Sequence, residues 1–418
     1  MKNVFTLSTL GTILDVKKSV AVAIGSTVAR QLLSSIFYFI SLWIVTRQLG
    51  PFENGILTAV MLFPQTLYSM LNFGLGASYI YFLSNSEGNY KQMRKISWIF
   101  SASLWGVVAI IIAFSSDSII SKYLPGARKD LVSFSTLLFP LMLLGSWTSS
   151  LVLGARKYDE YNKTLLIQPL SFLLLIVFFF FQKNISVITV IFCYLVSNFS
   201  LWILSEVKVA RLPEATNQRQ SISKIATFGL RAHLSNVITF LNYRIDLYLV
   251  TYFLSPTDTG IYALSIMLAE RLWLISGAAS MIVFPESSAN RADFKNLNGM
   301  VKRVANLVLK ITALGALIAG MLAQFFIPWI FGEAYAGSVM PFIILLPGIV
   351  IWSYMSVISN SLAGLGHINV NLLSALLSLC INIFGNLFAV PRFGILGAHI
   401  DKYIKRLISI HGHNFRLR

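Results

Sequence analysis

Two stretches of this sequence are copies of each other. VTRQLGPFENGI at positions 45–56 returns 205 residues later as VTYFLSPTDTGI at positions 250–261, with six of the twelve positions identical. Proline ends a helix because it lacks the amide needed to continue it, and glycine relieves crowding where the next helix starts. We therefore interpret both stretches as the same turn, between the first two helices of two related halves.

The correspondence between the halves continues beyond this turn with a slowly growing offset. The matched residues are Gly126 with Gly332, Pro140 with Pro347, and Gly154 with Gly364. Slow drift in one direction is expected of two copies of one ancestral unit. Parallel repeats of this kind place a substrate path at the interface of the two halves, near the middle of the bilayer.

Composition places most of the chain in a membrane. Of 418 residues, 56% are hydrophobic and only 12% are charged, about half the charged share of a soluble domain. A spanning helix needs about 20 mostly apolar residues, and hydrocarbon forces the backbone into helices. Eleven runs qualify: 19–46, 54–83, 96–115, 131–153, 164–182, 185–205, 224–253, 260–284, 303–330, 338–363 and 369–390. We predict an all-α membrane protein of two pseudo-symmetric six-helix bundles.

Basic residues outnumber acids by 33 to 16, which gives a net charge of +17. They lie in short clusters between apolar runs, so membrane topology explains them better than a nucleic-acid partner. Positive charge concentrates on the cytoplasmic side of membrane proteins, and this places the N-terminus in the cytoplasm. We predict an N-terminal bundle at 1–206, a cytoplasmic linker at 207–223, a C-terminal bundle with five clear spans at 224–398, and an atypical basic tail at 399–418.

Four short motifs resemble one family. They are VTRQLGPFENG at 45–55, NFGLG at 72–76, LGAR at 153–156 and LAGLG at 362–366. They are similar to polysaccharide biosynthesis membrane proteins, the O-antigen and lipid-linked oligosaccharide flippases of the multidrug/oligosaccharidyl-lipid/polysaccharide exporter superfamily. The resemblance covers about residues 20–398, and the motifs identify the superfamily better than its cargo.

The resemblance implies two bundles around a V-shaped central cavity. It also implies a cargo of undecaprenyl-diphosphate-linked oligosaccharide, carried from the inner to the outer leaflet of the bacterial plasma membrane by alternating access. We expect the lipid-linked cargo and the phospholipid bilayer as partners, no nucleic acid, and a monomeric protein. After residues 391–398 a twelfth span is expected, but a basic segment follows instead. We therefore expect the last helix of the second bundle to be missing or altered, through a truncated or frameshifted end.

Ionisable groups inside the bilayer are costly and usually face a water-filled cavity or a partner. Arg30 lies in the first span and Arg231 in the seventh, and the repeat places them one helical turn apart on matching faces. We predict that the two guanidinium groups face each other across the inner mouth of the cavity and bind a diphosphate. The alternative is that both reach the interface to place their charges in water.

Four further charges lie deeper in the second half, at Arg244, Asp246, Glu270 and Arg271. Neighbours two apart on a helix point in different directions, so Arg244 and Asp246 each need another partner. We predict Arg244 as a substrate-binding residue, and Asp246, Glu270 and Arg271 as coupling residues or members of structural ion pairs. A salt bridge between Glu270 and Arg244 is one expected arrangement. Structural pairing and substrate contact remain open for all four.

The same intramembrane charges help to distinguish a flippase from other membrane proteins. A cation-coupled multidrug exporter of this superfamily is the alternative, but it is expected to carry buried acids, and the intramembrane charges here include more arginines than acids. A membrane glycosyltransferase or polymerase is disfavoured because no large polar loop is present. Because no nucleophile–base set, phosphate loop or metal-ligand spacing is visible, we expect no enzymatic activity, no cofactor and no metal.

Overall fold

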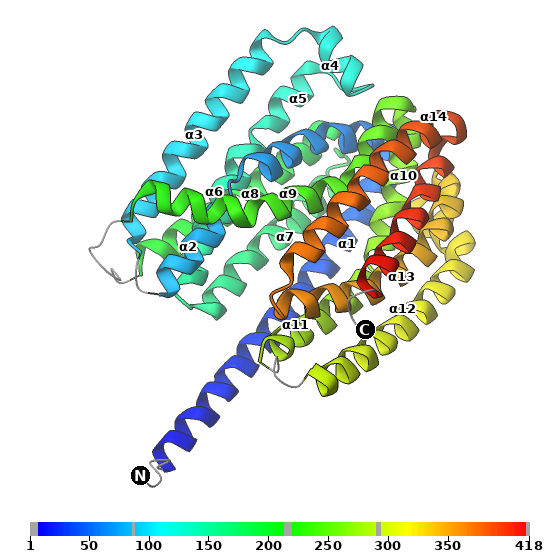
Figure 1. The fold of residues 1–418 in the computed structure, drawn as a ribbon. Helices are drawn as coiled ribbons and strands as arrows, with labels where there is room; N and C mark the ends of the chain where they lie inside the picture. The colour runs from blue at the N-terminus through cyan, green and yellow to red at the C-terminus, as the bar shows by residue number, and fades with distance from the viewer. Residues whose placement is uncertain (1–6, 86–87, 213–219, 290–293, 415–418) are drawn as a thin grey trace.

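The computed structural model describes residues 7–85, 88–212, 220–289 and 294–414 (Figure 1). Side chains are described for most of these positions, but not for 7–24, 231–232, 281, 285, 289, 294–295, 368 or 399–414. The first half contains α1 (Leu7–Leu71), α2 (Leu75–Ser84), α3 (Tyr90–Phe114), α4 (Asp117–Tyr123), α5 (Lys129–Thr136), α6 (Leu138–Gly154), α7 (Tyr158–Phe181) and α8 (Val187–Ala210). The second half contains α9 (Ile222–Phe253), α10 (Pro256–Glu270), α11 (Trp273–Ala289), α12 (Phe294–Phe331), the short 3-10 helix η1 (Glu333–Ser338), α13 (Val339–Gly364) and α14 (Ile368–Asn414).

Each of the eleven predicted apolar runs is helical along most of its length, with short breaks at 72–74, 137 and 271–272 in three of them. Among the described residues, nine helices are long and apolar enough to span a membrane. One of them, Gly25–Leu71, holds two predicted runs, because Gly50 turns the chain inside α1 with φ 71°. The run at 224–253 is α9, which is not among the nine since charged and amide side chains lower its apolarity. A second turn at Gly394 divides α14; its backbone stays helical to Asn414, whereas the last apolar span ends at Ala398.

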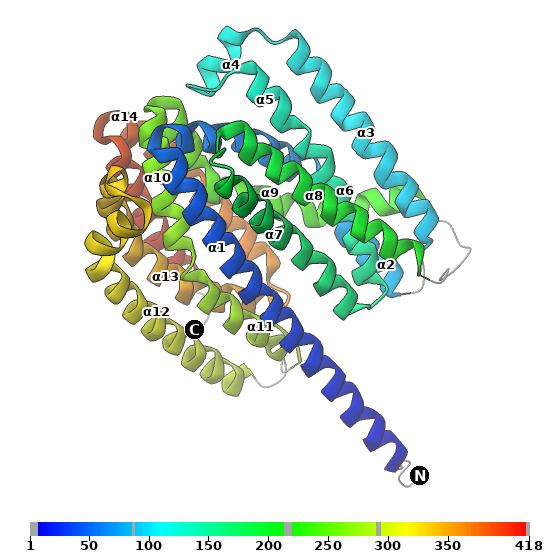
Figure 2. The ribbon, with the colours of Figure 1, turned by 180° about the vertical axis from the view of Figure 1, so that it is seen from behind.

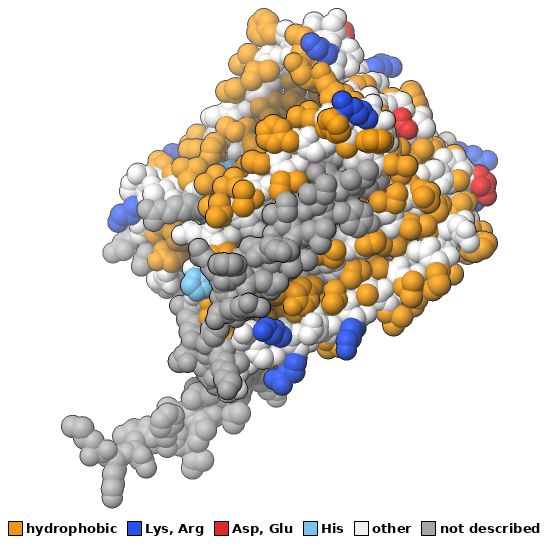
Figure 3. Space-filling view, turned by 45° about the vertical axis from the view of Figure 1, so that its right-hand side comes forward, with side chains coloured by type: hydrophobic (Ala, Val, Ile, Leu, Met, Phe, Trp, Pro, Cys, Tyr) orange, Lys and Arg blue, Asp and Glu red, His pale blue; other side chains and the backbone are white. Residues whose placement is uncertain are grey.

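The surface of the helices is apolar where a soluble protein would be polar. Phe114, Trp329 and Phe181 are each more than three-quarters exposed. Figure 3 shows hydrophobic side chains over much of one face, with lysines and arginines mostly around its margins. Large exposed apolar patches are rare on soluble monomers, so lipid covers this surface. The chain is a multi-pass membrane protein.

The helices form two lobes, each with its own core. One cluster of buried apolar side chains lies within residues 44–225 and includes Tyr79 and Trp147. Two further clusters lie mainly in the second half, around Tyr262 and around Met355. Figure 2 shows α1 with α7 and α8 on one side and with α12 and α13 on the other. The first helix is therefore well placed to contribute to the boundary between the lobes.

The two copies of the repeated turn pack against each other. A methyl group added at Gly55 would lie 2.6 Å from the carbonyl carbon of Pro256 and 3.0 Å from the amide nitrogen of Gly260. Reciprocally, a methyl group added at Gly260 would lie 2.9 Å from the carbonyl carbon of Pro51 and 3.0 Å from the amide nitrogen of Gly55. Only glycine allows this approach at both sites. The reciprocal contact is that of two copies related by a pseudo-twofold axis, as the repeat predicts.

The helix that follows each turn begins in a different way. In the second copy, Ser255 and Asp258 form a capping box, in which each side chain accepts a hydrogen bond from the backbone of the other. This satisfies two amides that have no partner inside the helix. In the first copy, Gly50 occupies the position of Ser255 and adopts a positive φ instead. The turn is thus kept in both halves with different local chemistry.

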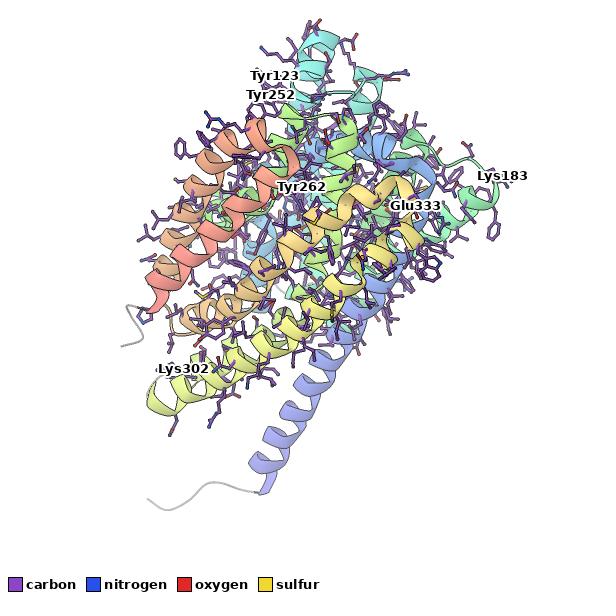
Figure 4. The ribbon with its side chains drawn as sticks, turned by 90° about the vertical axis from the view of Figure 1, so that its right-hand side faces the viewer. Tyr123, Lys183, Tyr252, Tyr262, Lys302 and Glu333 are labelled. Atoms are coloured by element: carbon purple, nitrogen blue, oxygen red, sulfur yellow. The ribbon has the colours of Figure 1, made fainter. Side chains whose placement is uncertain are left out.

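Contacts between the halves occur at both ends of the molecule. At the end that carries the repeated turns, Tyr123 of α4 stacks on Tyr252 of α9 with their ring centroids 6.4 Å apart, far from Lys302 at the other end (Figure 4). Near that other end, α9 packs on α2, where the Ser78 hydroxyl donates to the Ile225 carbonyl over 2.7 Å. The structure therefore has the two halves in contact on either side of its middle.

Candidate functional site

A cavity lies at the boundary between the halves, and we call it the interlobe cavity. It encloses about 170 Å³ and is lined by side chains of α1, α7 and α8 from the first half and of α9 and α10 from the second, ending at Arg271. Its polar lining from the first half includes Tyr38, Gln65 and Tyr194. Among the described residues that line it, the charged ones are Arg244 and Arg271, and none is an acid. The cavity is therefore positive.

Arg244 carries its charge beside a carboxylate. Its Nη1 lies 3.2 Å from Glu270 Oε1, and the two side chains are 29% and 21% exposed. This is the ion pair expected from sequence, formed between α9 and the last residue of α10. Because Glu270 neutralises its charge, Arg244 contributes hydrogen-bond donors in a fixed position to the cavity more than net positive charge.

Arg271 is placed by a break in the helix. The amides of Arg271 and Leu272 bond to the carbonyls of Leu268 and Ala269, three residues back, so the helical ladder stops before α11 begins. The break directs Arg271 into the interlobe cavity. Its Nε is buried, and in the part of the chain that the structure describes it has no hydrogen-bond partner and no ion pair. A guanidinium group in this condition favours an anion.

An aromatic wall from the first half faces these arginines. Tyr194 of α8 stacks on Phe172 of α7 with centroids 4.2 Å apart, and Tyr38 of α1 lies 6.2 Å from the same ring. All three residues line the interlobe cavity. Their apolar rings exclude water, which strengthens any electrostatic interaction made inside the cavity.

Asp246 lies outside this lining and is fully buried. Its Oδ2 accepts a hydrogen bond of 2.6 Å from the Tyr262 hydroxyl of α10. Arg244 and Asp246 thus have different partners, as their two-residue spacing on α9 predicts. The structure gives Asp246 a role in joining α9 to α10, and its role in coupling stays a prediction.

Arg30 is held by its own half. Its Nε donates to Asn162 Oδ1 of α7 over 3.1 Å, and the amide of Asn162 donates in turn to Ser26 and Thr27. The side chain of Arg231 lies outside the described part of the structure. The predicted pairing of Arg30 and Arg231 across an inner mouth therefore stays a prediction.

Comparison with known proteins identifies the family. The family model described as polysaccharide biosynthesis protein matches residues 44–340. This chain belongs to that family. No curated protein sequence matches it at a significant level.

The family member has the fold of several solved transporters. A lipid II flippase, MurJ, in an inward closed conformation superposes with a TM-score of 0.77 and 14% identity, over 93% of this chain and 86% of that one. An inward-facing multidrug resistance transporter of the MATE family superposes with a TM-score of 0.70 and 13% identity, over 94% of this chain and 98% of that one. A transporter from Pyrococcus furiosus superposes with a TM-score of 0.63 and 13% identity, over 94% of this chain and 95% of that one. It is described as having a binding pocket of reversed polarity that suggests a different function. At these identities the likeness establishes the fold.

Sequence reasoning about this polysaccharide biosynthesis protein missed two things. It did not separate Arg271 from the other buried charges, because the helix break beside it contains neither proline nor glycine. It also did not identify the neutral polar lining at Tyr38, Gln65 and Tyr194, which carries no charge to attract attention. The repeated turn could have pointed to both features, because it indicates which helices of the two halves meet and therefore which side chains line the space between them.

Proposed function

We propose that this protein is a flippase that carries an undecaprenyl-diphosphate-linked oligosaccharide from the cytoplasmic to the outer leaflet of a bacterial plasma membrane during surface polysaccharide synthesis. The observation that carries the proposal is Arg271, a guanidinium group without an acid partner among the described residues, in a cavity with no acid in its described lining. A diphosphate is the complementary ligand, since Arg binds phosphate with two parallel hydrogen bonds and remains charged.

The contacts at the two ends support a mechanism of alternating access. At the end with the repeated turns, Trp43 and Arg47 donate hydrogen bonds to the carbonyls of Trp329 and Ile330, the C-terminal turn of α12. At the opposite end, the turn before α2 approaches α9 so closely that a methyl group on Gly229 would lie 2.5 Å from the Phe73 carbonyl oxygen. In our proposal, these two sets of contacts break in turn, and the cargo headgroup passes through the interlobe cavity. The end with the turns faces outward and the N-terminus lies in the cytoplasm.

The second candidate is a cation-coupled small-molecule exporter. The observation in its favour is Asp246, a fully buried acid in the second half. Its hydrogen bond with Tyr262 gives that carboxylate a structural partner, and the positive interlobe cavity disfavours cationic cargo. We therefore rank this function second.

A binding experiment separates the two functions. Purified protein in detergent is titrated with undecaprenyl diphosphate and with tetraphenylphosphonium, a cationic drug, and the shift in melting temperature is measured. We expect stabilisation by the diphosphate, lost in Arg271→Ala and partly retained in Arg271→Lys. Stabilisation by tetraphenylphosphonium alone would instead establish the exporter.

The cellular test uses the surface polysaccharide. Arg271→Ala, Arg30→Ala and Arg231→Ala are expressed in cells that depend on this chain for the polymer. We expect loss of the polymer while the amount of protein in the membrane is unchanged. Normal polymer with Arg271→Ala would remove the proposed anion site.

A further inference from the structure

A second cavity lies inside the second lobe, and we call it the lobe cavity. It encloses about 390 Å³ between α9, α10, α11, α13 and α14. This volume falls within the range of small-molecule sites, about 300–1,000 Å³. It is more than twice the volume of the interlobe cavity.

The lining of the lobe cavity is neutral and rich in hydrogen-bonding groups. Thr239, Asn242, Asn360, Asn371 and five serines contribute hydroxyl and amide groups. The charged lining residue among those described is Glu270, whose carboxylate is bound to Arg244. Several of these groups already bond within the protein, as the amide of Asn360 does to the Ser280 hydroxyl, but their remaining hydrogen-bonding capacity makes this lining a poor match for a hydrocarbon or detergent tail.

Aromatic rings form one side of the same cavity. Tyr243 of α9 lies with its ring centroid 5.1 Å from that of Trp273 and 6.0 Å from that of Trp352. Apolar ring faces beside the hydroxyl and amide groups of the same lining suit a ligand that has both C–H faces and hydroxyl groups.

The lobe cavity and the interlobe cavity are neighbours. Ile266 lines both of them, and the Arg244–Glu270 ion pair joins one to the other, because Arg244 lines the interlobe cavity and Glu270 lines the lobe cavity. A ligand with an anionic group at Arg271 would therefore have its adjoining neutral part next to the lobe cavity.

We propose that the lobe cavity binds the sugar nearest to the diphosphate of the lipid-linked cargo. The proposal rests on the proposed function, since it assumes an anionic group at Arg271. A sugar ring meets the aromatic side through its C–H face and the amides and hydroxyls through its own hydroxyl groups. The second lobe then distinguishes a glycosylated lipid diphosphate from the bare one.

The test compares two probes on the purified full-length chain. Dissociation constants are measured by microscale thermophoresis for undecaprenyl diphosphate and for undecaprenyl diphosphate bearing one N-acetylhexosamine. We expect the sugar-bearing probe to bind at least about tenfold tighter, the worth of one or two net hydrogen bonds. A ratio near one for the unaltered chain would overturn the proposal.

Two variants localise the effect. Ala375→Leu fills the lobe cavity without removing a polar group, and Trp352→Leu removes an aromatic face. We expect both to reduce the ratio toward one while the affinity for the bare diphosphate is kept. The matched control is Ala102→Leu on the exposed face of α3, which should keep the ratio. If both lobe-cavity variants keep the full ratio, the sugar binds elsewhere.

Failure of the sugar site and failure of the flippase proposal give different results. Arg271→Ala should weaken both probes by the same factor and leave their ratio unchanged. A chain that binds both probes equally, and loses both with Arg271→Ala, has the anion site without the sugar site. A chain that binds neither probe would refute the proposed function itself.

Discussion

The reciprocal contact of the repeated turns predicts what a single methyl group will do. At Gly55 the added carbon would lie 2.6 Å from the Pro256 carbonyl carbon, whereas ordinary contact begins near 3.4 Å. The two turns must therefore move apart by at least about 0.8 Å, because backbone cannot rotate away as a flexible side chain can. At Gly260 the added carbon would lie 2.9 Å from the Pro51 carbonyl carbon and nearer still to its oxygen, so the turns there must separate by at least about 0.5 Å. We expect Gly55→Ala to be the more severe variant.

The energetic size follows from overpacking. Forcing an extra methyl into a packed site costs about 1–3 kcal/mol, and this cost falls on the conformation in which the turns touch. Since about 1.4 kcal/mol is a factor of ten in an equilibrium constant, Gly55→Ala should shift the population toward separation of the turns by roughly 5- to 150-fold. The gain in helix propensity from glycine to alanine, at most about 1 kcal/mol, stabilises both conformations alike and leaves this shift unchanged.

Cysteine labelling measures the shift. Thr58 lines the interlobe cavity, so Thr58→Cys is introduced into a chain whose two native cysteines, Cys193 and Cys380, are replaced by serine. The rate of reaction with a membrane-impermeant maleimide in proteoliposomes should rise about tenfold with Gly55→Ala. Gly106→Ala is the matched control, because an added methyl there meets nothing within 4 Å.

A double variant tests whether the contact is shared. One separation of the turns relieves both added methyl groups, so Gly55→Ala with Gly260→Ala should exceed the single Gly55→Ala only slightly. Additive effects of the two substitutions would show that the sites act independently. An unchanged labelling rate in both single variants would refute the reasoning from the repeated turn.

Three further substitutions test other contacts. Replacing Arg244 by Met should lower the unfolding free energy by about 1–3 kcal/mol by leaving Glu270 unpaired, and adding Glu270→Gln should recover much of it; no recovery would mean that the pair is not coupled. Glu206→Gln should destabilise by about 1–3 kcal/mol, because the buried carboxylate accepts from Arg94 and two tryptophan N–H groups; an unchanged thermal midpoint would contradict this. Arg47→Ala should weaken the contact with the C-terminal carbonyls of α12 by about 0.3–1 kcal/mol and raise maleimide labelling modestly; slower labelling would contradict it.

The helices could be predicted from sequence because lipid leaves the backbone few choices. Long apolar runs must be helical, and the paired Pro51 and Pro256 showed that the same turn between the first two helices occurs in each half. Such signals are local, and they survive without knowledge of the tertiary structure. The salt bridge between Arg244 and Glu270 was within reach because both residues lie on successive helices at matching depth.

The site itself depended on contacts that sequence does not encode locally. Arg30 bonds to Asn162, which is 132 positions away, and no spacing rule selects that amide over the others. The break that exposes Arg271 arises where tertiary packing overrides helix propensity, between residues that favour helices on their own. Whether a buried arginine is paired is therefore a property of the packed molecule.

The two lobes also show how a duplicated scaffold acquires one site. The repeat places Ser235 of α9 at the position of Arg30 in α1. In the first lobe the long arginine reaches α7 and bonds to Asn162. In the second lobe the short Ser235 and Asn371 of α14 line the lobe cavity instead. Exchange of a long side chain for a short one between corresponding helices leaves space for the lobe cavity in the second lobe. In our proposal, this difference between the halves lets a pseudo-symmetric scaffold bind an asymmetric ligand, charged at one end and neutral at the other.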